Sequence, residues 1–116
     1  MKILFILNDP PYGTERSFNA VRMVQALLKG EEKPDISVFL MADAVVCAKD
    51  GQAVPSGYYN LGHMIKGVAR KASVVLCGTC MDARGLTDEE LVPGPARGTM
   101  AELASMTMDA DKVLVF

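Results

Sequence analysis

The chain has 116 residues, of which 50% are hydrophobic and 22% charged, and its formal net charge at pH 7 is −2. That length suffices for one hydrophobic core, so we expect a single domain spanning residues 1–116. The weakly acidic balance, without any basic stripe, excludes an electrostatic nucleic-acid binder. No segment approaches the ~18 consecutive apolar residues of a membrane span, so we expect no membrane association either.

Compartment and assembly follow from two further features of the composition. The opening run Met1–Leu7 is too short for the core of a signal peptide, so we expect a cytoplasmic protein. Thiols are mostly reduced there, so Cys47, Cys77 and Cys80 are expected to be catalytic, metal-binding or core residues and not a disulfide framework. Because half of the residues in this small chain are hydrophobic, we expect part of that surface to be buried in a homo-oligomer.

Apolar runs and amphipathic stretches alternate along the chain, which predicts an α/β protein. The runs predict strands at Lys2–Leu7, Ile36–Met41, Ser73–Leu76 and Val113–Phe116, and the pair Leu91-Val92 is compatible with a small edge strand. Helical periodicity predicts helices over about Ser17–Lys29, 60–72 and Thr99–Met108, with a short helix at Ala42–Lys49. This alternation favours a mostly parallel sheet of four to five strands with helices on both faces.

Polar residues mark where three of these helices begin. Thr14 is expected to cap the first helix, with Glu15 in its first turn. Asn60 is expected to cap the helix that follows the loop at 51–58. Thr99 and Glu102 have the spacing of a capping box, which predicts the start of the last helix.

A pair of cysteines at the end of a predicted strand is the main candidate for chemistry. The apolar run Val74–Leu76 stops at Cys77, and Cys80 completes a Cys-x-x-Cys pair. Parallel sheets place their chemistry at the carboxyl ends of strands. Backbone N–H groups of a turn or helix start lower the pKa of a thiol in such a place. We therefore expect Cys77 to react as a thiolate, with Cys80 close enough to resolve a bond to it.

Neighbouring loops are expected to complete the substrate pocket. Gly78 allows close approach of the backbone, Thr79 offers a hydroxyl, and Arg84 offers a positive charge. The loop after the first strand should lie nearby, because the ends of parallel strands share one edge of the sheet, and it adds Tyr12 and Gly13. Simple loop packing accounts equally well for these last two residues.

Other interpretations of the cysteines stay open. The pair could pack beneath a helix as small apolar groups, as free cysteines often do. A zinc site needs about four ligands, and only Cys47 and His63 could join the pair, so we expect neither a metal nor a cofactor. Cys47 is expected in the core, and His63 in solvent because it lies off the apolar stripe of its helix.

The chain resembles members of the DsrE/DsrF-like family, which are small α/β proteins associated with intracellular sulfur transfer. The resemblance spans nearly the whole chain and rests on Pro11-Tyr12-Gly13, Ser17-Phe18-Asn19, Phe39–Val45, Gly57–Asn60, Cys77-x-x-Cys80 with Arg84-Gly85, Gly98-Thr99 and Ala110–Leu114. It implies a three-layer α/β/α fold and a ring-like homotrimer or homohexamer.

The resemblance also implies a role for one residue. In sulfur-relay members a cysteine eight residues before the glycine of Arg-Gly carries sulfur as a persulfide, and Cys77 has that position relative to Gly85. Cys80 departs from that pattern and could discharge the persulfide by forming a disulfide. We predict a sulfur-handling protein, a carrier or sulfurtransferase, with donor and acceptor proteins as partners. The alternatives are a thiol-disulfide oxidoreductase using Cys77 and Cys80, and a non-catalytic small-molecule binding or interaction module.

Overall fold

The computed structural model describes all residues from 1 to 116 and contains one sheet of five parallel strands. The strand order is β4-β3-β2-β1-β5. The strands are β1 (Lys2–Leu7), β2 (Asp35–Leu40), β3 (Ser73–Cys77), β4 (Ala96–Gly98) and β5 (Lys112–Val115). The predicted fold class, a mostly parallel α/β sheet of four to five strands, is confirmed.

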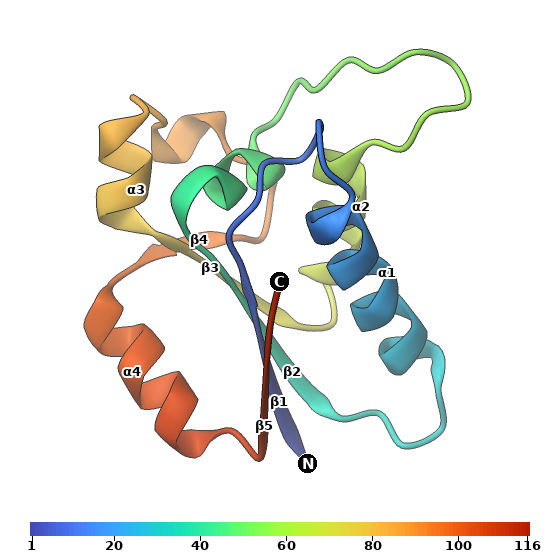
Figure 1. Cartoon of the computed structure of the whole chain (residues 1–116), viewed down its shortest axis with the longest axis vertical. Coiled ribbons are helices and arrows are strands. Elements are labelled where there is room, and N and C mark those ends of the chain that lie inside the picture. The colour runs from blue at the N-terminus through green and yellow to red at the C-terminus, as the bar shows by residue number, and fades with distance from the viewer.

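Helices cover both faces of the sheet (Figure 1). On one side lie α1 (Arg16–Lys29) and α2 (Leu61–Val68), and on the other lies α4 (Met100–Asp109). The short helix α3 (Gly78–Ala83) and the 3₁₀ turns η1 (Ala42–Ala48) and η2 (Asp88–Glu90) lie towards the edge where β2 and β3 end. None of these helices is long and apolar enough to cross a membrane.

The core explains why the central strands are apolar on both faces. Leu4 and Phe5 point to opposite faces of β1, and both are buried, as are Val38 and Phe39 in β2. Burying each such side chain contributes about 1.5–3 kcal/mol of transfer free energy. The two helix layers are therefore held to the sheet by side chains that alternate along the same strands.

Two of the predicted helix starts are confirmed in detail. The Asn60 side chain accepts a hydrogen bond from the backbone N–H of His63 at 3.0 Å. Thr99 does the same for the N–H of Glu102 at 3.1 Å. The expectation for the first helix was wrong by one residue, because Glu15 is its N-cap. Thr14 instead accepts from the N–H of Arg16 and donates to Asp9, so it organises the preceding turn.

The edge strand lies later in the chain than expected. Leu91 makes only an isolated antiparallel bridge with Lys49, whereas Ala96–Gly98 pairs with β3 and forms β4. Gly94 has φ +112° and turns the chain between them. Nothing in three residues reading Ala-Arg-Gly resembles an apolar strand, which is why the pattern missed it. The predicted short helix at Ala42–Lys49 is a 3₁₀ turn.

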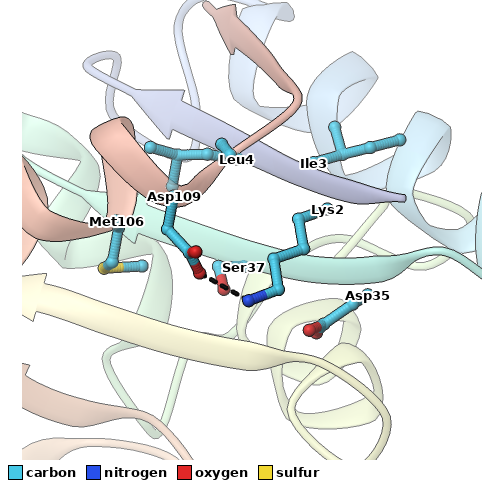
Figure 2. Close-up of a pocket in the computed structure, with 8 residues that line it drawn as sticks. Lys2, Ile3, Leu4, Asp35, Ser37, Met106 and Asp109 are labelled. Carbon is cyan, nitrogen blue, oxygen red and sulfur yellow. Dashed lines mark hydrogen bonds and ion pairs between the residues drawn. The ribbon is translucent and has the colours of Figure 1, made fainter.

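An ion pair ties the amino edge of the sheet to α4. Lys2 Nζ lies 2.6 Å from Asp109 in a small depression of about 70 Å³, which also holds Asp35 and Ser37 (Figure 2). The backbone N–H of Lys2 donates to Asp111, just before β5. These contacts fasten β1, α4 and β5 together at the edge opposite the cysteine pair, so we interpret the depression as structural.

Candidate functional site

Cys77 is the last residue of β3 and the N-cap of α3. Its backbone is extended, with φ −61° and ψ 114°, and its Sγ accepts a hydrogen bond from the N–H of Cys80 at 3.3 Å. This is the geometry in which Ser or Asp caps a helix, with sulfur in place of oxygen. The change from strand to helix at one residue thus directs an amide onto the sulfur.

The hydrogen bonds around Cys77 favour its anion. Burial opposes the charge, but the Cys80 thiol, the Thr79 hydroxyl and the amides of both residues hold the pKa of Cys77 below its usual range. Thr79 Oγ1 lies 3.2 Å from Cys77 Sγ. Cys77 is therefore the more acidic thiol of the pair.

Cys80 is held in a different environment. Its burial, and the Cys77 sulfur beside it, raise the pKa of Cys80. Its Sγ accepts a hydrogen bond from the N–H of Ala42 at 3.2 Å, and Ala42 has the left-handed φ of +52°. The pKa values of the two thiols are therefore shifted in opposite directions, and Cys77 ionises before Cys80.

A pocket of about 200 Å³ opens beside Cys77, between the carboxyl ends of β3 and β4. Its lining comes from two adjacent strand-to-helix junctions and consists of Cys77, Gly78, Thr79, Arg97, Gly98, Thr99 and Met100. Cys77 is only 5% exposed, but that surface faces the pocket. Chains leaving neighbouring parallel strands into separate helices form such crevices, which are the usual ligand sites of α/β sheets.

Arg97 supplies the positive charge of this pocket. Its Nη2 donates to Asp82 on α3 at 2.6 Å, and its Nε lies against the backbone of Gly78. A Cβ at Gly78 would lie 2.8 Å from Arg97 Nε, so glycine makes room for the guanidinium. The Cys77 and Asp82 charges are among the causes that raise the pKa of Arg97, after the hydrogen bond to Asp82.

Of the predicted pocket residues, Gly78 and Thr79 line the cavity with Cys77, whereas Arg84 faces another way. Arg84 pairs with Asp43 at 2.8 Å and donates to the carbonyl oxygen of Cys80 at 3.0 Å. Arg84 therefore fastens α3 to η1 and lies behind the cysteine pair, where its charge acts on Cys80.

Tyr12 and Gly13 also lie outside the pocket lining. The Tyr12 hydroxyl donates to Gln52 at 2.6 Å and accepts from the N–H of Leu61 at 3.2 Å. Its ring packs on Tyr59 with a centroid separation of 5.6 Å. Gly13 has φ +93° and makes the turn that leads to α1. Tyr12 thus anchors the 51–60 loop to α2.

The remaining candidates have structural surroundings. Cys47 is fully buried, and burial raises the pKa of its thiol to about 12. His63 is exposed on α2. No three Cys, His, Asp or Glu side chains lie close enough together to ligate a metal ion.

Four pocket residues were not predicted from the sequence: Arg97, Gly98, Thr99 and Met100. The signal was present but indirect: the N-cap residue Thr99 marks a strand-to-helix junction like the one at Cys77. Gly98 is the second clue: a Cβ there would meet Val75, so only glycine lets β4 approach β3 so closely.

The sequence profile of the DsrE/DsrF-like family matches residues 1–116. The chain belongs to the DsrE/DsrF-like family. It is 42% identical to the protein YchN of Escherichia coli (strain K12), covering 99% of this chain and 98% of that protein. It is 36% identical to MJ0989 of Methanocaldococcus jannaschii over the full length of both.

A solved structure supports the assignment of this chain to the DsrE/DsrF-like family. The crystal structure of YchN from E. coli matches with a TM-score of 0.91 over 99% of this chain and 98% of that one. More distantly, the chain is 25% identical to the sulfurtransferase TusD of Yersinia pseudotuberculosis, covering 100% of this chain and 98% of TusD. The fold is therefore common to this family, and one distant relative carries the name of a sulfurtransferase.

Proposed function

We propose that this protein handles sulfane sulfur, with Cys77 as the residue that carries it as a persulfide. One observation carries the proposal. The Cys77 sulfur accepts a hydrogen bond from the Cys80 amide and lies within hydrogen-bonding distance of the Thr79 hydroxyl, and Cys77 lines a pocket. A thiolate is the form of cysteine that attacks sulfur. Membership of the DsrE/DsrF-like family and the distant likeness to a sulfurtransferase support the same chemistry.

In the proposed loading step the Cys77 thiolate attacks the outer sulfur of a donor persulfide, R–S–SH. A new S–S bond forms on Cys77, the donor S–S bond breaks, and the donor leaves as R–S⁻. The amides that face Cys77 also favour the anionic persulfide, because its negative charge stays on sulfur. Transfer to an acceptor thiolate is the same exchange, with Cys77 as the leaving group.

Intact-protein mass spectrometry tests the loading step. Reduced protein incubated with cysteamine persulfide should gain the mass of one sulfur atom, and peptide mapping should place it on Cys77. The variant Cys77→Ser should gain nothing, while Cys47→Ser should load like the parent because Cys47 is buried away from the pocket. Absence of any sulfur on Cys77 would rule the carrier role out, and unreactive thiols would favour a purely binding module.

A second candidate is thiol-disulfide exchange by the Cys77–Cys80 pair. The opposite pKa shifts of the two sulfurs favour it, because one thiol attacks and the other resolves. On a loaded protein, the Cys80 thiolate would attack Cys77 Sγ, form the disulfide and release HS⁻. Cys80→Ser should then hold its persulfide longer than the parent. Equal lifetimes in the two proteins would remove Cys80 from the mechanism.

We further propose a cytoplasmic homotrimer or homohexamer that exchanges sulfur with donor and acceptor proteins. Reduced thiols suit the cytoplasm. Exposed apolar side chains support self-association: Val115 is 66% exposed on edge strand β5, and Met108 is 88% exposed on α4. Met100, which lines the Cys77 pocket, is also exposed, so a neighbouring subunit could reach the site.

A further inference from the structure

The pocket beside Cys77 has a charge pattern that the carrier role alone does not require. One cationic group lines the cavity with Cys77: Arg97 is ion-paired with Asp82 through Nη2, and its Nε and Nη1 have no hydrogen-bond partner. Arginine presents five donors in a planar fork, so these two nitrogens remain available to oxyanions.

The carboxylates near Arg97 lie outside the cavity lining. Asp82 is 64% exposed and lies on the α3 side of the guanidinium. Glu102 lies on the β4 side, with Oε2 3.0 Å from the place of a Gly98 Cβ, and it is exposed. Asp82 and Glu102 are not among the residues that line the cavity, whereas Arg97, Thr79 and Thr99 are. The amino end of α4 opens on the same cavity and favours negative charge as well.

We propose that this pocket binds a small thiosulfonate, with thiosulfate as the simplest member, and that Arg97 holds its sulfonate oxygens while Cys77 takes the outer sulfur. The proposal rests on the persulfide role of Cys77 and specifies its small-molecule donor. A thiolate and an anionic donor repel each other, and a cation beside the reacting sulfur reduces that repulsion. Arg97 is the only cationic residue of the lining.

The reaction balances without any further reagent. The Cys77 thiolate attacks the outer sulfur of thiosulfate, a Cys77 S–S bond forms, and the S–S bond of thiosulfate breaks. The electron pair of that bond leaves with sulfite, and Cys77 is left as the persulfide anion. The total charge is unchanged, and no oxidant or reductant is consumed. Arg97 stabilises the sulfite as its charge develops, through charge-assisted hydrogen bonds.

Two donors, one with a sulfonate group and one without, separate this proposal from the carrier role. Reduced full-length protein is mixed with thiosulfate or with cysteamine persulfide, whose ammonium group is a cation. Sulfur on Cys77 is followed by mass spectrometry, and sulfite is measured in the thiosulfate arm. The parent should load from both donors and release one sulfite per persulfide formed from thiosulfate.

Variants test the part played by Arg97. Arg97→Met should slow thiosulfate loading by about tenfold to a hundredfold, as expected for losing a charge-assisted hydrogen bond, and should slow cysteamine persulfide loading much less, through the lost charge beside Cys77 alone. Gly78→Ala should act in the same direction, because its Cβ displaces the guanidinium. Arg70→Met is the matched control. Arg70 is exposed and lies just before the amino end of β3, away from the pocket, so this variant should load from both donors at the parental rates.

The outcomes distinguish two failures. If the parent loads from cysteamine persulfide but not from thiosulfate, or if Arg97→Met uses thiosulfate at the parental rate, the thiosulfonate proposal is overturned and the carrier role stands. If Cys77 loads from neither donor, both fall. An equal loss in Arg97→Met with both donors overturns the assignment of Arg97 to oxyanion recognition.

Discussion

At the residue scale, three cysteines of one chain acquire three different chemistries from their surroundings. Cys77 has amides and a hydroxyl directed at its sulfur, Cys80 faces Ala42 and the Cys77 sulfur, and Cys47 is enclosed in the core. Sequence could locate Cys77 at a strand end, because an apolar run stops there. It could not reveal which amide would donate, since that depends on the first turn of α3.

Thr79 is expected to contribute to the acidity of Cys77. Thr79→Val removes the hydroxyl 3.2 Å from Sγ, so the pKa of Cys77 should rise and its thiolate fraction at pH 7 should fall. Alkylation by iodoacetamide at pH 7 should slow by roughly two- to tenfold, the range for one hydrogen bond. Thr107→Val is the control, because Thr107 bonds only within α4. Parental reactivity in Thr79→Val would contradict this role.

Cys47 is expected to be inert in the folded protein. Burial raises its pKa to about 12, so it stays a neutral thiol through pH 7–9 and is shielded from reagents. Peptide mapping after iodoacetamide treatment of native protein should find Cys77 modified and Cys47 unmodified, with Cys47 labelled only in urea. Labelling of Cys47 at the rate of Cys77 under native conditions would contradict its placement in the core.

At the element scale, the helices and strands that were predicted correctly are those with clear hydrophobic periodicity or a recognisable helix cap. β1, β2, α1 and α2 were predicted within a few residues, because their side chains alternate or repeat against the core. β4 escaped, since it has three residues and only Gly98 is buried. The pocket lies between β3 and β4, so missing β4 also hid Arg97. Tyr12 was assigned to the pocket because the loops after parallel strands lie at one end of the sheet, whereas its hydrogen bond to Gln52 depends on how the 51–60 loop folds.

The cap of α2 offers a test at this scale. Asn60 accepts from the N–H of His63 and donates to the carbonyl of Gln52, so it fixes both the helix and the loop before it. Asn60→Ala should lower the free energy of unfolding by about 1–2 kcal/mol. His63→Ala, an exposed change on the same helix, should leave it within about 0.5 kcal/mol of the parent in urea unfolding. Equal stabilities of the two variants would refute the cap.

At the scale of the whole molecule, the amino ends of the strands carry structural contacts, and the carboxyl ends carry the candidate reactive site. At the amino end of β1, Lys2 contacts Asp109 and Asp111. The cysteine pair and its pocket lie at the carboxyl ends of the strands. Four of the seven large apolar side chains left exposed lie on β5 and α4, namely Val113, Val115, Met100 and Met108. The composition pointed to such a surface, but only the structure locates it on an edge strand.

Self-association should depend on that surface. Val115→Asp places a charge on exposed β5, so it should reduce the mass measured by analytical ultracentrifugation towards that of one chain. Ala53→Asp adds the same charge to an exposed loop and should leave the parental mass unchanged. Two variants with the same assembly as the parent would show that β5 is not the contact surface.

The pH dependence of Cys77 alkylation tests the account most directly. Wild-type protein is treated with iodoacetamide across pH 5–10, and the labelling of each cysteine is resolved by peptide mass spectrometry. Because the folded site lowers the pKa of Cys77, its rate should reach half of its plateau below the ~8.5 of a free cysteine, and well below the midpoint for Cys80. A Cys77 midpoint at or above that of a free cysteine would contradict the claim that this site holds a reactive thiolate.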